Sequence, residues 1–174
     1  MDTGSFEELA MPLLTSLYNF AHWLTQDASE AEDLVQETCV KALKGFSSFR
    51  QGTNFRAWIF KILRNTFLTL RTGLKVDMAS LDDDESGITE PAAQGTPESA
   101  FLAGVDYEMI QNALEALTVP FREVIVLCDV EEMSYQEIAE TLAVPVGTVM
   151  SRLSRARKAM RTALRGQQVR GASR

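Results

Sequence analysis

Residues 134–157 read SYQEIAETLAVPVGTVMSRLSRAR and contain two amphipathic helical patterns separated by a short turn. Ser134 followed three residues later by Glu137 matches the capping box, in which each residue satisfies a backbone N–H that the first helical turn leaves without a partner. A helix is therefore predicted to begin here, with Ile138 and Leu142 on its apolar side. A turn at residues 143–146 is expected to follow.

The second pattern predicts a helix that starts near Gly147 and Thr148 and runs to about Leu164. Apolar residues recur on it every three or four positions, as expected for the face that packs on the domain: Val149, Leu153, Ala156, Met160 and Leu164. Other angles of the helix carry Met150, Ser151, Ser154, Arg155 and Lys158. Arginine binds guanine edges and phosphates through two parallel hydrogen bonds. The two helices are thus predicted to form a helix-turn-helix whose second helix faces DNA.

The distribution of charge supports a nucleic-acid partner, although the net charge of −7 at first argues against one. Residues 41–72 contain seven basic residues and no acidic one, and residues 147–174 contain eight basic residues and no acidic one. Because salt screens distant charges, the local surface decides whether phosphates are attracted. Two solvated helix faces are the alternative interpretation, and the absence of acids in both blocks disfavours it.

Composition divides the chain into three parts. Residues 73–104 are acidic, contain several Gly and Pro residues and few large apolar ones, so they cannot bury enough surface to offset their ordering entropy. They are predicted to be a flexible acidic linker between an N-terminal unit, residues 1–72, and a C-terminal unit, residues 105–174. Helical periodicity and the lack of strand patterns predict an all-α fold for both units.

Three helices are expected in the N-terminal unit. The first covers residues 13–24, and the second runs from about Ser29, as its N-cap, to Lys44. A polar loop at residues 47–54 precedes the third helix, from Phe55 to Arg71, whose wide apolar stripe is predicted to bury Trp58. In the C-terminal unit, two short helices over residues 107–117 and 120–128 are expected before the helix-turn-helix.

Several classes of function are disfavoured. No apolar run approaches the ~20 residues that span a bilayer, and residues 1–8 lack the basic and apolar regions of a signal peptide, so a cytoplasmic protein is expected. Cys39 and Cys128 have no metal-ligand spacing and are predicted to be buried, reduced thiols. The single histidine, His22, is expected to be structural. No metal, cofactor or catalytic pair is predicted, and the protein is not expected to be an enzyme.

Two separate parts of the sequence resemble the extracytoplasmic-function (ECF) sigma factors of the sigma-70 family. The residues 134–139 and 144–157 are similar to the fourth conserved region of these proteins. The residues AEDLVQET at 31–38 and FRAWIFKILRN at 55–65 are similar to the second region. The order, the spacing and the intervening linker also agree. The resemblance therefore implies a protein that binds core RNA polymerase and promoter DNA, and we expect an anti-sigma factor as a further partner.

The resemblance also implies roles for individual residues. The helix with Asp33, Gln36 and Glu37 corresponds to the helix that docks on core polymerase. The part that captures an unstacked base of the −10 element and holds the melted strand corresponds to seven residues, here called the −10 residues: Phe49, Arg50, Asn54, Arg56, Lys61, Arg64 and Asn65. The −35 element corresponds to a second set, the −35 residues: Met150, Ser151, Arg152, Ser154, Arg155, Arg157 and Lys158. Position 150 is often arginine in the family, so Met150 leaves the −35 base preference open.

Three other interpretations are considered. An ordinary helix-turn-helix repressor or activator leaves the N-terminal unit unexplained. A sigma-like decoy that binds only an anti-sigma protein has no need for a DNA-facing basic surface, whereas this chain has two basic blocks. An enzyme is disfavoured because no nucleophile–base pair or phosphate-binding loop is visible.

Overall fold

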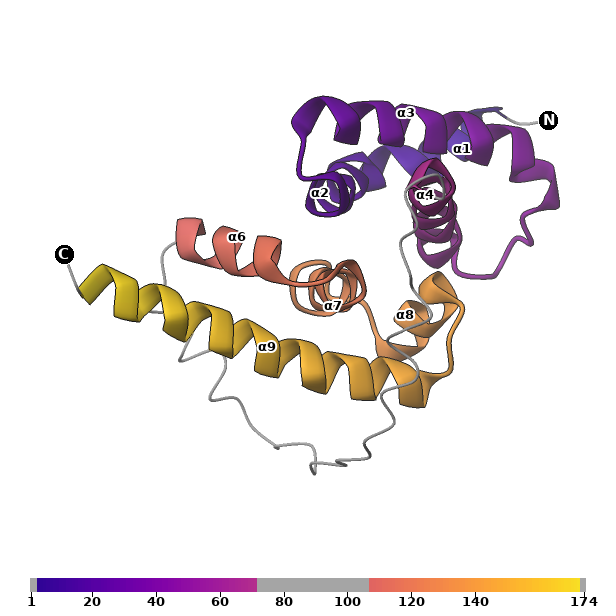
Figure 1. Ribbon diagram of the computed structural model, residues 1–174. Coiled ribbons are helices and arrows are strands. Elements are labelled where there is room, and N and C mark those ends of the chain that lie inside the picture. The colour runs from indigo at the N-terminus through magenta and orange to yellow at the C-terminus, as the bar shows by residue number, and fades with distance from the viewer. Residues whose placement is uncertain (1–2, 72–106, 173–174) are drawn as a thin grey trace.

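The structure is a computed structural model that describes residues 3–71 and 107–172. All regular elements in these parts are helices and none is a strand, which confirms the all-α prediction. The predicted linker, residues 73–104, lies outside the described residues, so the bounds of the three parts stay predictions. Two units are visible side by side, the N-terminal one in indigo to magenta and the C-terminal one in salmon to yellow (Figure 1).

The N-terminal unit consists of α1 (Thr3–Ala10), η1 (Met11–Leu13), α2 (Leu14–Thr25), α3 (Ala28–Gly45), η2 (Phe46–Ser48) and α4 (Phe55–Arg71). The third predicted helix, from Phe55 to Arg71, is confirmed at both ends. The predicted N-cap of α3 is wrong, because Asp27 and not Ser29 is the capping residue. The extended backbone of Asp27 lets its carboxylate accept a hydrogen bond from the Glu30 N–H at 2.8 Å.

The C-terminal unit consists of α6 (Tyr107–Ala116), α7 (Val119–Ile125), a π-helical segment η5 (Val126–Val130), α8 (Tyr135–Leu142) and α9 (Val146–Ala172). The short helix predicted over residues 120–128 is therefore divided between α7 and η5. The last helix starts where it was expected but continues past Leu164 to Ala172. Its predicted end followed the last apolar repeat, and the segment beyond it contains no proline, so the helix can continue through Gly166.

The core of the N-terminal unit lies between α2, α3 and α4. Its side chains come from the predicted apolar stripes, and the most completely buried include Leu17, Phe20, Leu34, Phe60 and Leu63. Phe20 of α2 meets Phe60 of α4 with ring centroids 5.6 Å apart, so aromatic packing joins the two helices directly. This packing holds α4 with one face toward the core and its N-terminus next to the polar loop.

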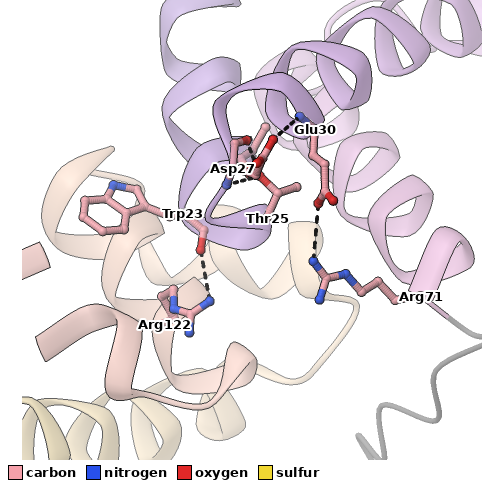
Figure 2. A network of polar contacts seen from close by, with 7 residues as sticks. Trp23, Thr25, Asp27, Glu30, Arg71 and Arg122 are labelled. Carbon is pink, nitrogen blue, oxygen red and sulfur yellow. Dashed lines mark hydrogen bonds and ion pairs between the residues drawn. The ribbon is translucent and has the colours of Figure 1, made fainter. Parts of the chain in front are cut away.

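Arg122 of α7 joins elements through backbone carbonyl groups. Its buried guanidinium donates hydrogen bonds to the carbonyl oxygens of Leu114, Glu115 and Leu117, at 2.8 to 3.1 Å, and so satisfies the C-terminal end of α6. A fourth hydrogen bond, 3.1 Å long, reaches the carbonyl oxygen of Trp23 in α2 (Figure 2). Burial lowers the pKa of Arg122, although the side chain of Glu115 acts in the opposite direction.

The two units pack against each other along one side. Helix α2 contacts α7, and α4 contacts α8. The buried apolar side chains of both units belong to a single cluster, which includes Leu24 on one side and Val124 on the other. The two units are therefore in direct contact, an arrangement that we call closed. Helix α9 runs along the outer side of α6 and α7 (Figure 1).

Candidate nucleic-acid interface

The predicted capping box forms at the start of α8. The Ser134 side chain accepts a hydrogen bond from the Glu137 N–H at 3.1 Å, and the Glu137 carboxylate accepts one from the Ser134 N–H at 2.9 Å. Ala143 ends the helix with a φ of 55°, in the left-handed region that usually favours glycine. The chain then enters α9 after Pro145, whose carbonyl oxygen accepts the N–H of Val149 at 3.2 Å. The two helices are thus joined by a tight turn, as the helix-turn-helix prediction requires.

Helix α9 buries the predicted stripe and exposes most of the side chains predicted to face DNA. All five apolar residues of the stripe, from Val149 to Leu164, are buried. Arg155 is half-buried, and the exposed members of the −35 residues are Met150, Ser151, Ser154 and Lys158. These five form an accessible polar and basic surface, with Met150, 48% exposed, as its one large apolar side chain.

Two of the −35 residues, Arg152 and Arg157, lie near acidic side chains of the C-terminal unit and are less accessible than most of the others. Arg152 is only 6% exposed and is close enough to Glu123 of α7 to lower the pKa of that carboxyl group, so its charge is directed into the C-terminal unit and not outward. Arg157 is half-buried and donates a hydrogen bond of 2.8 Å to the Asp129 carboxylate. The family resemblance implied DNA contacts for both arginines. On α9, however, each lies beside the buried stripe, where Arg152 is near Glu123 of α7 and Arg157 is bound to Asp129 of η5.

An aromatic cluster supports the polar loop of the N-terminal unit. Phe49 stacks on Phe46 at 5.9 Å and lies 5.1 Å from Trp58 and 5.3 Å from Phe55, all between ring centroids. Phe6 of α1 closes the cluster with edge contacts to Phe46 and Phe55. Phe49 and Trp58 stay half-buried, so their rings are partly accessible beside the loop. Trp58 is thus less buried than predicted.

The other −10 residues fall into two groups. Arg50, Lys61 and Asn65 are exposed. Lys61 also lines an open groove of about 640 Å³ whose other walls are α8 and the turn that precedes α9. Asn54 and Arg56 are half-buried and Arg64 is buried, because each of these three side chains faces the C-terminal unit.

Arg64 forms a buried ion pair with Glu123. Its Nε and one terminal nitrogen donate to the two carboxylate oxygens at 2.8 and 3.2 Å, and the two side chains are 9% and 0% exposed. The other terminal nitrogen lies 3.5 Å from the carbonyl oxygen of Leu142. Burial raises the pKa of Glu123, and the guanidinium groups of Arg64 and Arg152 offset part of this rise.

Asn54 and Arg56 bind two further acidic residues of the C-terminal unit. The Asn54 amide donates to the Glu137 carboxylate at 2.8 Å. Arg56 donates to the carbonyl oxygen of Glu131, and its guanidinium lies 3.6 Å from the Glu131 carboxylate. Burial acts to raise the pKa of Glu137, but the hydrogen bonds from Asn54 and Ser134 and the charge of Arg56 outweigh it and lower the pKa.

The residues predicted to dock on polymerase form an exposed acidic face on α3. Asp33, Gln36 and Glu37 are all exposed, and Glu37 forms an ion pair of 3.5 Å with Lys41 one turn later. Val40 and Leu43 add exposed apolar area next to them, at 51% and 43%. An accessible surface of mixed acidic and apolar character thus lies on the side of α3 that is turned away from the core.

Sequence reasoning missed Glu123, Glu131 and Arg122. The signal for Glu123 and Arg122 is their position in an otherwise apolar segment, PFREVIVL at 120–127, because charged residues are rarely buried without a partner. That signal predicts a buried partner without identifying it. Glu131, in the connection before α8, has no comparable signal in the sequence.

In the described ranges, 3–71 and 107–172, no helix combines the length and apolarity needed to cross a membrane. No cluster of three or more His, Cys, Asp or Glu side chains is arranged there to hold a metal. Cys39 and Cys128 form no disulfide bond in the described residues and are half-buried, less than predicted, and the Arg157 guanidinium donates to the Cys128 sulfur at 3.7 Å. His22 is half-buried too, between the rings of Tyr18 and Trp23.

Comparisons with known proteins agree on one family. The family model "Sigma-70 region 2" matches residues 9–75, and "Sigma-70, region 4" matches residues 107–160. The ECF RNA polymerase sigma factor SigE of Mycolicibacterium smegmatis is 35% identical over 90% of this chain, which spans 60% of that protein's length. The ECF RNA polymerase sigma factor EcfG of Rhodopseudomonas palustris is 33% identical over 89% of this chain and 82% of its own length.

A solved structure is also similar. The sigma factor RpoE of Bartonella quintana, in complex with the anti-sigma factor NepR, has a TM-score of 0.70 and 33% identity, over 92% of this chain and 97% of that one. The similarity extends through both units and not only through the helix-turn-helix. The chain belongs to the ECF sigma factors of the sigma-70 family, whose function is promoter-specific initiation of transcription by RNA polymerase.

Proposed function

We propose that this chain binds core RNA polymerase through the exposed face of α3 and directs it to promoters by contacting DNA with both units. In this proposal α9 contacts the −35 element, and the loop at residues 47–54 together with α4 holds the melted −10 strand. The polymerase performs the chemistry, and the chain supplies binding free energy at two places. A tether between the units makes the second binding event intramolecular, so two modest affinities combine.

The observation that carries the proposal is the pair of accessible basic surfaces on separate units of a family member. On α9, the accessible side of the helix carries Ser151, Ser154, Arg155 and Lys158, and the opposite side is buried. On the N-terminal unit, Arg50 and Lys61 lie beside partly accessible aromatic rings. A basic groove with aromatic platforms binds single-stranded DNA, and each stacked base contributes ~1–3 kcal/mol.

The individual assignments follow from chemistry and position. Ser151, Ser154 and Arg155 of α9 supply hydrogen-bond donors for base edges, and Lys158 supplies a point charge for phosphate. Asp33, Gln36 and Glu37 offer acceptors to a basic docking surface on the polymerase. We place the chain in the cytoplasm, where its proposed partners are, and expect regulation by an anti-sigma factor, as in the similar RpoE–NepR complex.

Transcription with purified core RNA polymerase on a promoter library tests the proposal. We expect the chain to direct transcription from defined start sites and the selected promoters to share two sequence elements, one near −35 and one near −10. Core polymerase alone is the control. If the chain binds duplex DNA but adds no defined start sites, an ordinary helix-turn-helix regulator explains it better and the proposal fails.

A further inference from the structure

The aromatic cluster beside the polar loop contains one ring that is not among the −10 residues and comes from another helix. Phe6 belongs to α1 and is only 6% exposed. Its ring centroid lies 5.4 Å from that of Phe46 and 6.1 Å from that of Phe55, at interplanar angles of 73° and 78°. Edge-to-face contacts of this kind are a preferred arrangement of aromatic pairs. Helix α1 thus reaches the base of the loop through a buried ring.

The loop at residues 47–54 depends on these rings for its attachment. The Thr53 side chain donates a hydrogen bond to the carbonyl oxygen of Arg50 at 2.6 Å. The Phe49 N–H donates to the carbonyl oxygen of Phe46 at 3.0 Å. Such bonds between residues three positions apart shape turns, but they do not attach the middle of the loop to the helices. The ring of Phe49 makes that attachment.

Phe6 contacts the same rings that hold Phe49. Phe49 stacks on Phe46 at 5.9 Å and 12°, and it meets Phe55 edge-on at 5.3 Å and 85°. Phe46 and Phe55 therefore connect Phe6 to Phe49. Protein interiors are packed as densely as organic crystals, so a change of volume at one side chain displaces its neighbours. The position of the Phe49 ring thus depends on the ring of Phe6.

The accessible side of the cluster consists of Phe49 and Trp58. Both side chains are half-buried, and their ring centroids are 5.1 Å apart. A base that stacks on a ring already held in place does not have to order that ring, so less of the stacking free energy is lost on binding. Phe6 is too buried to touch a base itself. Any effect of Phe6 on the melted strand must therefore pass through the accessible rings.

We infer that Phe6 is a positioning residue for capture of the −10 strand: it holds Phe46 and Phe55, which fix the Phe49 ring in the orientation on which a base stacks. The inference rests on the proposed function for the role of the loop, and it adds α1 to the elements that determine affinity for the strand. Preorganisation of this kind strengthens binding without a new contact to the ligand. Binding to the −35 element is unaffected, because α9 belongs to the other unit.

Phe6→Leu keeps an apolar side chain on α1 and removes the ring, so Phe46 and Phe55 gain space to move. The measurement is the affinity of core polymerase carrying each variant for a forked promoter fragment with a duplex −35 element and a single-stranded −10 element. We expect Phe6→Leu to lower this affinity by roughly three- to tenfold, a large part of what one stacked base contributes. A duplex that contains the −35 element alone measures the fraction of complexes able to bind DNA.

Phe20→Leu is the matched control. Phe20 is a fully buried ring of the same unit, and it packs on Phe60 and not on the aromatic cluster beside the loop. Its replacement by leucine removes a comparable ring from the core, so we expect a lower melting temperature and an affinity for the forked fragment within about twofold of the original. Melting curves show which variants are folded at the assay temperature. If Phe6→Leu is not, Phe6→Met, which fills the space more fully, takes its place.

A double-mutant cycle determines whether Phe6 acts through Phe49. Phe49→Ala removes the ring on which the base is proposed to stack and should lower the affinity by roughly tenfold. Adding Phe6→Leu to Phe49→Ala should then cost less than about twofold, because the ring that Phe6 positions is already gone. Two independent effects would instead multiply.

Tryptophan fluorescence reports the state of the cluster in the free chain without DNA. The sequence has two tryptophans, so Trp23→Phe leaves Trp58 as the only one. Movement of Phe49 away from Trp58 uncovers the indole ring, so Phe6→Leu should raise the acrylamide quenching constant of Trp58. Phe20→Leu should leave this constant unchanged.

The outcomes separate this inference from the proposed function. A folded Phe6→Leu variant overturns the inference alone if either the quenching of Trp58 or the affinity for the forked fragment stays unchanged while transcription starts at defined sites. Equal losses of affinity for Phe6→Leu and Phe20→Leu overturn it too, because a general loss of packing then explains the effect. So does a loss from Phe6→Leu that is as large with Phe49→Ala as without it. If the unsubstituted chain directs no defined start sites, the proposed function fails and the inference fails with it.

Discussion

Arg157 of α9 and Asp129 of η5 are joined by a hydrogen bond of 2.8 Å between guanidinium and carboxylate. The two side chains are 28% and 39% exposed, so solvent screens much of the attraction, and such pairs contribute roughly 0–1 kcal/mol to stability. The pair therefore restrains Arg157 more than it stabilises the unit. It places an acidic group beside the helix that is proposed to approach the −35 phosphates.

Asp129→Ala should strengthen binding to −35 duplex DNA. The substitution releases Arg157 for a phosphate and removes a negative charge, so we expect a several-fold gain in affinity and a salt dependence steeper by about 0.9 in log–log slope. Titration of labelled duplex at several salt concentrations measures both. Glu132→Gln, at an exposed neighbour, is the control for net charge. An unchanged slope in Asp129→Ala contradicts a phosphate contact by Arg157.

Arg155→Ala should change sequence preference at one −35 position and weaken specific binding by roughly 1–3 kcal/mol. A library of −35 variants measured against both proteins gives the preference. Arg152→Ala is the informative comparison, because Arg152 is 6% exposed and next to Glu123. We expect it to lower the melting temperature and leave the base preference as it was. The assignment fails if Arg155→Ala shows the original preference at every position.

Lys61→Ala should weaken the open promoter complex uniformly across promoter sequences. Lys61 is exposed on α4, and losing one phosphate contact to a single strand removes about 0.7 from the log–log salt slope. Lifetimes of the open complex at increasing salt measure this change. Arg165→Ala removes an exposed charge from α9, on the other unit, and should leave the slope unaltered. Equal slopes for Lys61→Ala and the unsubstituted chain argue against this contact.

Asp33→Arg should impair binding to core polymerase without unfolding the chain. Asp33 is exposed on α3, so the substitution buries nothing and reverses the charge only at the proposed docking face. Affinity for fluorescent core polymerase is the measurement, with a decrease of tenfold or more expected. Glu8→Arg on α1 makes the same charge reversal elsewhere on the N-terminal unit. Equal affinities for the two variants remove α3 as the docking surface.

The thiol of Cys39 should react slowly with alkylating agents at neutral pH. Burial raises its pKa above the ordinary value of about 8.5, so the reactive thiolate is scarcer than in an exposed cysteine. Alkylation rates measured against pH in a Cys128→Ser background should rise with a midpoint above that of an exposed reference, Ser29→Cys in the cysteine-free chain. A midpoint at or below the reference would instead mark Cys39 as a redox-sensitive thiol.

Local patterns predict the helices well and the partners of charged side chains poorly. The ends of α4 and the capping box of α8 follow from apolar spacing and from Ser134 and Glu137, since both depend on neighbours within one turn. The N-cap of α3 is less predictable, because the sequence favours Ser29 whereas the extended backbone and the accepting carboxylate of Asp27 make that residue the cap.

The closed arrangement has no counterpart in any local pattern. Arg64 and Glu123 are 59 positions apart, and no spacing rule relates them. The local sequence around an arginine such as Arg64 does not indicate whether its side chain binds DNA or a carboxylate of the same chain. Arg152 shows a related limit within one unit. It lies three residues after Val149 and four before Ala156, beside the buried stripe of α9, but this position does not identify Glu123 of α7 as its neighbour.

Glu137 serves two neighbours with one carboxylate. One oxygen accepts the Ser134 N–H inside the capping box, and the other accepts the Asn54 amide from the opposite unit. Separation of the units therefore removes only the outer hydrogen bond and leaves the start of α8 intact. The first helix of the helix-turn-helix therefore keeps its cap whether or not the two units are in contact, so its start does not depend on the other unit for hydrogen bonds.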